Sequence, residues 1–216
     1  MDDRERFESS AHRDPGGRDS PADGVARQWD GAPHCGRGTD NAWRGRSVIL
    51  TDLIVRQASV ADIDAVSGIL REVSDWLVAR GTPMWRENEV HPDAIRAEIE
   101  AGLFFLATLA GEPAGTLKFQ LSDPLFWPEA GHDAAYVHRL AVRRRFAGRG
   151  LSTALLAWAA DRAAAHGRPF LRLDCDAERT RLRAVYERFG FRHHSDRQVG
   201  QYFVARYEYT IPAGLE

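Results

Sequence analysis

The stretch from Ala134 to Thr153, AAYVHRLAVRRRFAGRGLST, constrains the fold more than any other part of this sequence. Its first nine residues favour a β-strand, because aromatic, β-branched and aliphatic residues dominate them around a polar pair, His138-Arg139. A basic loop then leads to Gly148-Arg149-Gly150. From Leu151 the alanine-rich run LSTALLAWAADRAAAHG predicts an amphipathic helix that ends at Gly167.

A glycine-rich turn between a strand and a helix can bind an anion. The first N–H groups of a helix have no partner within the helix, and the helix dipole places partial positive charge at the same end. Glycine has no Cβ, so phosphate oxygens can approach the backbone closely. Four arginines, at positions 143, 144, 145 and 149, add positive charge around this turn. The stretch therefore predicts a phosphate-binding turn.

Two other phosphate-binding motifs fit this turn less well. A P-loop requires GxxxxGK[ST], but Lys118, the one lysine of the chain, lies in a different stretch. A dinucleotide fingerprint requires glycine where Thr153 stands, and its first glycine should follow the strand directly. Here five residues separate Val142 from Gly148. Asp174, at the end of the next predicted strand, is the one feature that suits a dinucleotide site.

The turn resembles the acetyl-CoA-binding motif of the GNAT superfamily of N-acetyltransferases, [QR]-x-x-G-x-[GA]. Aligned from Val142, the motif covers residues 147–152; Gly150 matches, whereas Ala147 and Ser152 depart from the pattern. A second family motif, N-x-x-[AL]-x-x-x-Y-x-x-x-G-F, resembles RTRLRAVYERFGF at residues 179–191. Its matching residues are Leu182, Tyr186, Gly190 and Phe191, and Arg179 replaces the asparagine. The resemblance covers roughly residues 53–210.

This resemblance implies the fold and the cofactor site. The fold would be of the α/β (α+β) class, with a mixed, mostly antiparallel central sheet flanked by helices. Acetyl-CoA would be the co-substrate, and its pantetheine arm would pair with the backbone of the predicted strand at Leu140, Ala141 and Val142. The pyrophosphate would lie on the turn and first helical residues. At the position of Arg179 the family's asparagine helps to position the pantetheine region; for the arginine, solvation at the surface is the first interpretation and contact with a phosphate the second. The turn residues are Ala147, Gly148, Arg149, Gly150, Leu151, Ser152 and Thr153.

Acetyl transfer from a thioester to an amine needs a base for the amine and an acid for the departing thiolate. The second motif implies Tyr186 as the acid, although its spacing from Leu182 and Phe189 also suits a core residue. His138 is the leading candidate for the base, because an imidazole accepts protons near neutral pH. A histidine hydrogen-bonded within the sheet explains it equally well. Weaker candidates are Tyr136, Asp123, Glu87, Asp174 and Asp176.

The acceptor is predicted to be a primary amine of a small molecule or a peptide. Loops on either side of the predicted sheet combine aromatic residues with carboxylates, a pairing that suits a cationic amine. The predicted substrate-binding residues are Trp85, Asp123, Trp127 and Tyr136, although the tryptophans could equally pack the loops onto the sheet. Cys175 is interpreted as a small buried residue. A non-catalytic acyl-CoA-binding module with the same fold stays open as the alternative.

Composition separates residues 1–48 from residues 49–216. The first segment holds nine acids, eight arginines and seven glycines but almost no aliphatic residues, so we expect a disordered extension before one acetyltransferase domain. The net charge of −2 favours neither nucleic acid nor an anionic membrane as a partner. The sequence shows no metal-binding motif, no signal peptide and no run of about 20 apolar residues. A cytoplasmic protein is expected, and a homodimer is compatible with the sequence.

The remaining elements are predicted from periodicity. Strands are expected at residues 53–58, 103–110, 114–121, 134–142, 170–174 and 201–211. Helices are expected from a Ser59–Asp62 capping box to about Arg80, from His91 to about Leu103, from Leu151 to Gly167 and from Glu178 to Phe189. Residues 84–90 and 122–132 are predicted loops. The order is β-α-α-β-β-β-α-β-α-β.

Overall fold

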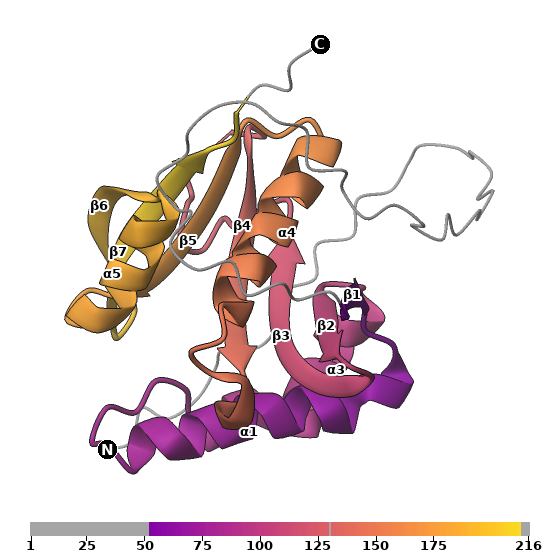
Figure 1. Cartoon of the computed structure of the whole chain (residues 1–216). Coiled ribbons are helices and arrows are strands. Elements are labelled where there is room, and N and C mark those ends of the chain that lie inside the picture. The colour runs from indigo at the N-terminus through magenta and orange to yellow at the C-terminus, as the bar shows by residue number, and fades with distance from the viewer. Residues whose placement is uncertain (1–51, 130, 213–216) are drawn as a thin grey trace, which may run out of the picture. The chain divides into compact units, whose positions relative to one another are not determined.

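A seven-stranded sheet in the order β1-β2-β3-β4-β5-β7-β6 organises the computed structural model, which describes residues 52–129 and 131–212 (Figure 1). Every neighbouring pair of strands is antiparallel except β4 and β5, which are parallel. The strands are β1 (Leu53–Gln57), β2 (Phe104–Leu109), β3 (Glu112–Gln120), β4 (Ala134–Val142), β5 (Phe170–Asp176), β6 (Arg192–Val199) and β7 (Tyr202–Thr210). The predicted fold class is confirmed. The predicted extension, residues 1–48, lies outside the described residues.

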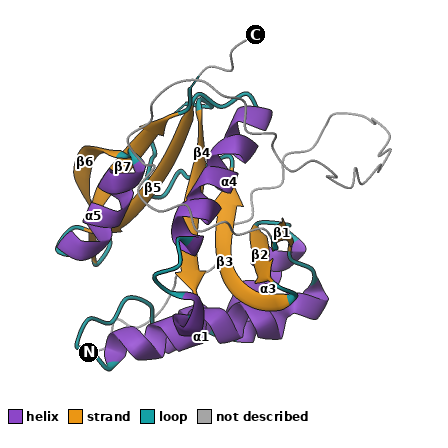
Figure 2. Ribbon diagram, viewed as in Figure 1, coloured by secondary structure: helices purple, strands orange, loops and turns teal. Residues whose placement is uncertain are grey.

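Helices cover both faces of the sheet (Figure 2). They are α1 (Ile63–Val78), α2 (Glu87–Val90), α3 (Pro92–Glu100), α4 (Leu151–Ala165) and α5 (Thr180–Phe189), with short 3-10 turns η1 (Val60–Asp62) and η2 (Arg144–Phe146). The predicted capping box is present, because Ser59 and Asp62 exchange hydrogen bonds at the start of η1. Within the described residues, no helix is long and apolar enough to cross a bilayer.

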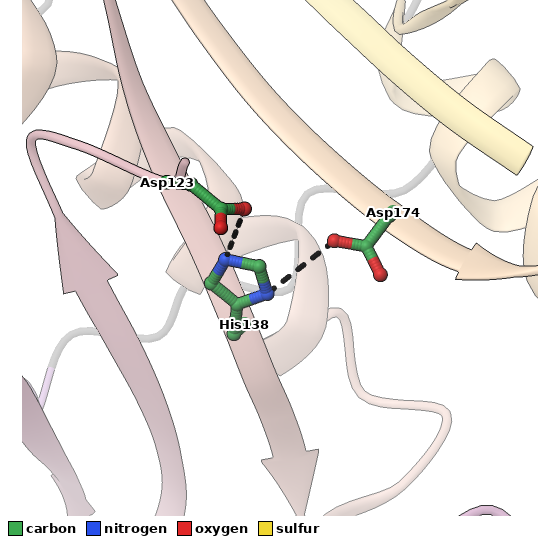
Figure 3. Close-up of side chains that lie close together, drawn as sticks. All are labelled: Asp123, His138 and Asp174. Atoms are coloured by element: carbon green, nitrogen blue, oxygen red, sulfur yellow. Dashed lines mark ion pairs between the residues drawn. The ribbon is translucent and has the colours of Figure 1, made fainter. Parts of the chain in front are cut away.

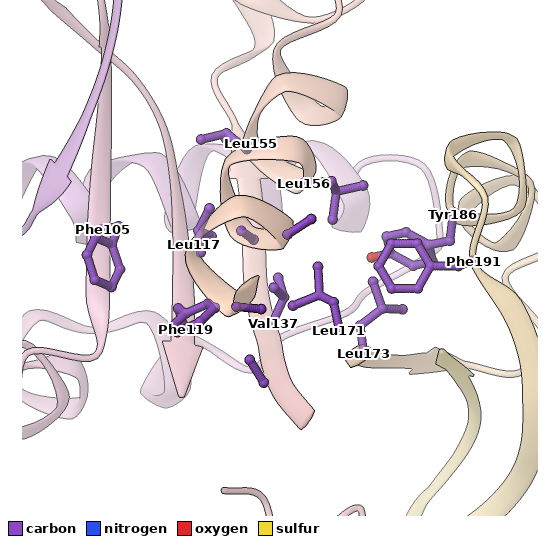
Figure 4. Close-up of a cluster of buried hydrophobic side chains, with 14 of the residues drawn as sticks. Phe105, Leu117, Phe119, Val137, Leu155, Leu156, Leu171, Leu173, Tyr186 and Phe191 are labelled. Carbon is purple, nitrogen blue, oxygen red and sulfur yellow. The ribbon is translucent and has the colours of Figure 1, made fainter. Parts of the chain in front are cut away.

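Alternation along the strands builds one core on each face of the sheet. In β2, Phe105 and Ala107 join the core under α4 and α5, whereas Phe104 and Leu106 join the core under α1 and α3. Figure 4 shows the first of these cores, in which leucines of α4 pack on β3, β4 and β5. Because both faces are covered, the strands at the centre of the sheet read as nearly continuous apolar runs.

The parallel pair β4–β5 forms a seam that opens partway along its length. The two strands pair from Ala134↔Phe170 to Val137↔Leu173, and no pairing between them is described beyond that point. At the same place β4 carries a bulge: Lys118 pairs with His138 and Thr116 with Ala141, so two residues of β4 face one of β3. Arg139 takes a left-handed φ of 49° there. A bulge bends and twists its strand, which directs the second half of β4 away from β5.

Two elements were absent from the sequence prediction. The predicted loop at residues 84–90 contains the short helix α2, whose first turn is capped by Glu89 accepting from the Arg86 amide. The strand β6 was missed because RHHSDRQV has no apolar alternation. It is an edge strand whose side chains are mostly exposed, and exposure removes the periodic signal that predicts a strand. Helix α5 begins at Thr180, two residues later than predicted.

Candidate active site

A cavity of about 880 Å³ lies where β4 and β5 separate. Its walls come from the loop that follows α1, the loop that follows β3, the open halves of β4 and β5, helix α5, and the turn between β6 and β7. Its lining includes Trp85, Lys118, Asp123, Phe126, His138, Leu140, Asp174, Cys175, Arg179, Leu182 and Tyr186. The seam therefore ends in a chamber that contains both predicted catalytic residues.

His138 lies between two carboxylates (Figure 3). Its Nε2 is 3.1 Å from Asp123 Oδ2, and its Nδ1 is 3.4 Å from Asp174 Oδ1. These contacts lack hydrogen-bond geometry, so Nε2 and the two facing oxygens are buried atoms without a hydrogen-bond partner among the described residues. Asp123 belongs to the loop after β3, where its Oδ1 accepts from the Phe126 amide at 3.3 Å. The Phe126 ring lies 5.9 Å from the imidazole.

The three side chains of this cluster could all be metal ligands, since their ligand atoms lie within 4.8 Å of one another. The two carboxylates, however, face opposite nitrogens of the imidazole. A histidine binds a metal ion through one nitrogen, so an ion at Nε2 or Nδ1 would replace the contact between that nitrogen and its carboxylate. The arrangement suits an imidazole that gives or holds protons at both nitrogens.

Burial and a like charge change the acidity of Asp174. Desolvation raises the pKa of this carboxyl to about 6; the neighbouring Asp123 charge also raises it, while His138 and Arg206 lower it. Asp174 therefore titrates close to neutral pH. Perturbed acids in a cavity are a frequent mark of functional sites.

Tyr186 points from α5 towards the same chamber. It is 7% exposed, and its ring lies 6.0 Å from Phe191 and 6.2 Å from Tyr207. Burial, together with Cys175 and Asp174 nearby, raises the pKa of the phenol above its ordinary value, so the hydroxyl keeps its proton. Its hydroxyl makes no hydrogen bond within the described part of the chain. Packing explains the position of the Tyr186 ring, and its hydroxyl, which faces the cavity, is available to donate to a bound molecule.

Cys175 lies beside Tyr186 in the cavity wall. Burial, with contributions from Asp174, raises the pKa of its thiol to about 12. A thiol of this pKa stays protonated at neutral pH and is a poor nucleophile. The interpretation of Cys175 as a small buried residue agrees with its 7% exposure.

The glycine turn, which lies between η2 and α4, presents free backbone donors. Gly148 and Gly150 take φ values of 77° and 82°, which are left-handed, and Gly150 is the N-cap of α4. The amides of residues 148–153 donate to no other described residue, whereas the next amide, that of Ala154, bonds to the Gly150 carbonyl at 3.0 Å. A Cβ built at either glycine meets no atom within 4 Å. The space beside both glycines is therefore open.

Arg179 bonds to other parts of the protein. Its guanidinium donates to the carbonyls of Thr82 and Pro83, at 3.1 Å for Thr82, and lies 3.9 Å from Asp176. It thereby ties α5 to the loop after α1 across the cavity. This side chain is mostly buried, at 14% exposed. Contact with a cofactor stays a prediction for Arg179.

The four predicted substrate-binding residues separate into two groups. Trp85 and Asp123 line the cavity. Trp127 and Tyr136 are 2% and 1% exposed and do not line it; their rings lie 6.2 Å apart in a small core of their own. Trp127 is held between the guanidinium groups of Arg172 and Arg206, at 5.0 and 4.6 Å. These two residues anchor the loop after β3 and lie behind the cavity wall.

Sequence reasoning missed two ion pairs of the cavity wall. Lys118 pairs with Glu98, and Arg139 donates to the Glu89 carbonyl and lies 4.0 Å from the Glu89 carboxylate. Both partners come from the segment between α1 and β2, which lies far from β3 and β4 in the sequence. The signal available in the sequence was Lys118, a charged residue inside the apolar strand β3, because a buried charge needs a partner.

The fold and the site together define a class: an acyltransferase built on a mixed sheet that splits at its parallel pair beside a free-amide turn. Residues 70–191 match the model of the acetyltransferase (GNAT) family. The uncharacterized N-acetyltransferase YesJ of Bacillus subtilis (strain 168) is 32% identical over 139 residues, which are 60% of this chain and 76% of that protein. The chain belongs to the GNAT acetyltransferase family and is an acyltransferase.

Solved structures share the fold. A GNAT-family acetyltransferase from Listeria monocytogenes 4b F2365 is 27% identical with a TM-score of 0.62, covering 73% of this chain and 94% of that one. The PaiA N-acetyltransferase of Thermoplasma acidophilum, solved in complex with coenzyme A, is 17% identical with a TM-score of 0.58, covering 73% and 99%.

Proposed function

We propose that the protein transfers an acetyl group from acetyl-CoA directly to a primary amine of a small molecule or a peptide. The observation that carries this proposal is the cavity at the open end of the β4–β5 seam, which contains His138 and Tyr186, together with the free-amide turn that follows β4 in the chain. The backbone of β4 beyond Val137 has no described partner on the β5 side, so a pantetheine arm can add there as an extra strand would. The pyrophosphate would take the amides of residues 148–153.

The chemistry follows from the two residues in the cavity. An alkylamine has a pKa near 10 and enters mostly as an ammonium ion, so a base is needed before it can attack the thioester. His138 would accept that proton. Tyr186 would donate its proton to the departing thiolate, because the phenol remains protonated until the C–S bond breaks.

Direct transfer is favoured over a covalent acetyl-enzyme. Among the described residues lining the cavity, Cys175 is the thiol that could carry an acetyl group, and its raised pKa keeps it protonated. Attack by the amine on the bound thioester needs no such intermediate.

The test is a panel of amines assayed with acetyl-CoA by thiol release, with the acetylated product identified by mass spectrometry. We expect transfer to at least one alkylamine, with initial rates showing a ternary complex. Parallel lines in a double-reciprocal plot, together with acetylated Cys175, would replace direct transfer by a two-step route. Acetyl-CoA binding with no transfer to any amine would favour the non-catalytic module.

A further inference from the structure

The cluster of His138 and its two carboxylates lacks a hydrogen-bond donor. A neutral imidazole has one N–H, which can satisfy Asp174 or Asp123 but not both. If the proton is on Nδ1, facing Asp174, then Nε2 turns a lone pair towards Asp123 Oδ2 at 3.1 Å. Two acceptors at that distance repel each other unless a donor stands between or beside them.

The neighbouring cations do not supply that donor. Lys118, which pairs with His138 across β3 and β4, is engaged by Glu98, and Arg139 is engaged by Glu89. Arg206, from β7, lowers the pKa of Asp174, but its guanidinium is hydrogen-bonded to Glu129, Ser195 and the Phe126 carbonyl. Among the described charged side chains, His138 is thus the one basic group that pairs with Asp123 and Asp174.

We infer that the two carboxylates have separate tasks: Asp123 binds the ammonium group of the acceptor, and Asp174 holds the Nδ1 proton of His138 so that Nε2 takes the proton from that ammonium. The inference rests on the proposed function and deepens it. Asp123 and the Phe126 ring face the cavity from the loop after β3, as a carboxylate and an aromatic that suit a cation. Asp174 is a positioning residue, because it acts through His138.

Protons balance in this sequence. The ammonium gives one proton to Nε2, and the two carboxylates, 3.1 and 3.4 Å from the ring nitrogens, stabilise the charge of the resulting imidazolium. The amine then forms the C–N bond with the thioester carbon as the C–S bond breaks, and the thiolate takes the Tyr186 proton. The new amide loses its second nitrogen proton, which restores Tyr186. The His138 proton leaves to solvent, so one proton is released for each acetyl group transferred.

The experiment compares Asp174→Asn, Asp123→Asn and the control Asp161→Asn, an exposed acid of α4 outside the cavity. For Asp174→Asn we expect kcat to fall at least about 10-fold, with the amine KM changed less than about 3-fold. The acidic limb of its kcat/KM profile should move to lower pH, because an imidazolium without its carboxylate is a stronger acid. For Asp123→Asn we expect the amine KM to rise at least about 10-fold. Asp161→Asn should match wild type.

Several outcomes would overturn the inference. If the Asp174→Asn enzyme is folded by circular dichroism and its pH profile is unaltered, Asp174 has only a structural role. If this variant does not fold, Asp174→Glu replaces it in the test. A displaced acidic limb in Asp174→Glu would support the inference, and an undisplaced limb would refute it. Stoichiometric binding of Zn²⁺ or Mg²⁺, lost in His138→Gln and accompanied by changed activity, would make the cluster a metal site. Wild-type protein that binds acetyl-CoA but acetylates no amine would instead refute the proposed function.

Discussion

Replacing Tyr186 by phenylalanine separates the two roles that its position allows. The ring packs against Phe191 and Tyr207, and phenylalanine keeps that packing. Its hydroxyl makes no hydrogen bond among the described residues, so its removal should change the free energy of unfolding by less than about 0.5 kcal/mol. A general acid contributes about 100- to 10,000-fold to a rate, or about 3 to 5 kcal/mol of transition-state stabilisation.

Tyr207 provides the matched control. It is a buried tyrosine beside Tyr186, but its hydroxyl donates to Glu187 at 2.8 Å and accepts from Arg183 at 2.7 Å. Tyr207→Phe should therefore cost about 1 to 3 kcal/mol of stability and leave kcat near the wild-type value. Tyr186→Phe should do the reverse, with kcat at least about 100-fold lower, acetyl-CoA affinity unchanged and Tm unchanged.

The assays are thermal unfolding, calorimetric titration of acetyl-CoA and steady-state rates with the best amine. Burial raises the pKa of the Tyr186 phenol above its ordinary value of 10. Ionisation of Tyr186 should therefore cause no fall in wild-type kcat below pH 10. A Tyr186→Phe enzyme with full kcat would return this residue to the core, and the thiolate would then leave without an acid from α5.

Three further perturbations test the turn and the buried acids. Gly150→Glu and Gly167→Glu place the same residue at left-handed positions at opposite ends of α4, so each variant should lose about 1 to 2 kcal/mol of stability. Only Gly150→Glu should weaken acetyl-CoA binding, by at least about 10-fold in calorimetry. Equal affinities would remove the turn from the cofactor site. The folded-state pKa of Asp174, about 6, lies above its ordinary 3.8, so this group's stabilising contribution is present below about pH 4 and is lost as pH rises through 6. Asp174→Asn should accordingly raise Tm at pH 8 and have a smaller effect at pH 4; a lower Tm at pH 8 would contradict this. The pH dependence of stability expected from Asp62 has the opposite sign. Hydrogen bonds from Arg56 and Ser59 lower the pKa of its carboxyl, so Asp62 stabilises the fold above about pH 4 and loses that effect in acid. Asp62→Asn should cost about 1 to 2 kcal/mol at pH 7 in urea unfolding, with a gap that closes below pH 3; a constant gap would argue against an ionic origin.

Elements with a buried face could be predicted from the sequence. Helix α1 repeats apolar residues at helical spacing, β4 is an apolar run, and the capping box at Ser59 marks a helix start, because burial and capping each leave a periodic or fixed-offset pattern. The edge strand β6 leaves none. The bulge at Arg139 also leaves none, since a left-handed φ at arginine has no local signal comparable to glycine.

The residues of the candidate site also divide into those that the sequence indicates and those that only the structure brings together. His138 and Tyr186 could be singled out because each occupies a position in a motif or beside one. Asp174 and Asp123 come from separate segments, and their approach to opposite nitrogens of His138 depends on how β5 and the loop after β3 are placed in space. Trp127 was predicted to contact substrate because its residue type suits a cation, but the cations that it meets are Arg172 and Arg206 of the protein itself.

The seam also divides the molecule along the chain, and this has a consequence for folding order. Strands β1 to β4 are neighbours in the sheet in the same order as in the sequence, and β5, β7 and β6 form a second block. Within these blocks the hairpins β2–β3 and β6–β7 close over short turns, whereas β1–β2 and β5–β7 close over segments that contain helices. The four pairs between β4 and β5 must close across α4. Because pairings that close longer loops are slower to form, the two hairpins should assemble early and the pairs that close over helices, the seam among them, should assemble later. The contacts that frame the cavity would then form after the two hairpins, so the geometry of the cavity depends on both blocks being in place.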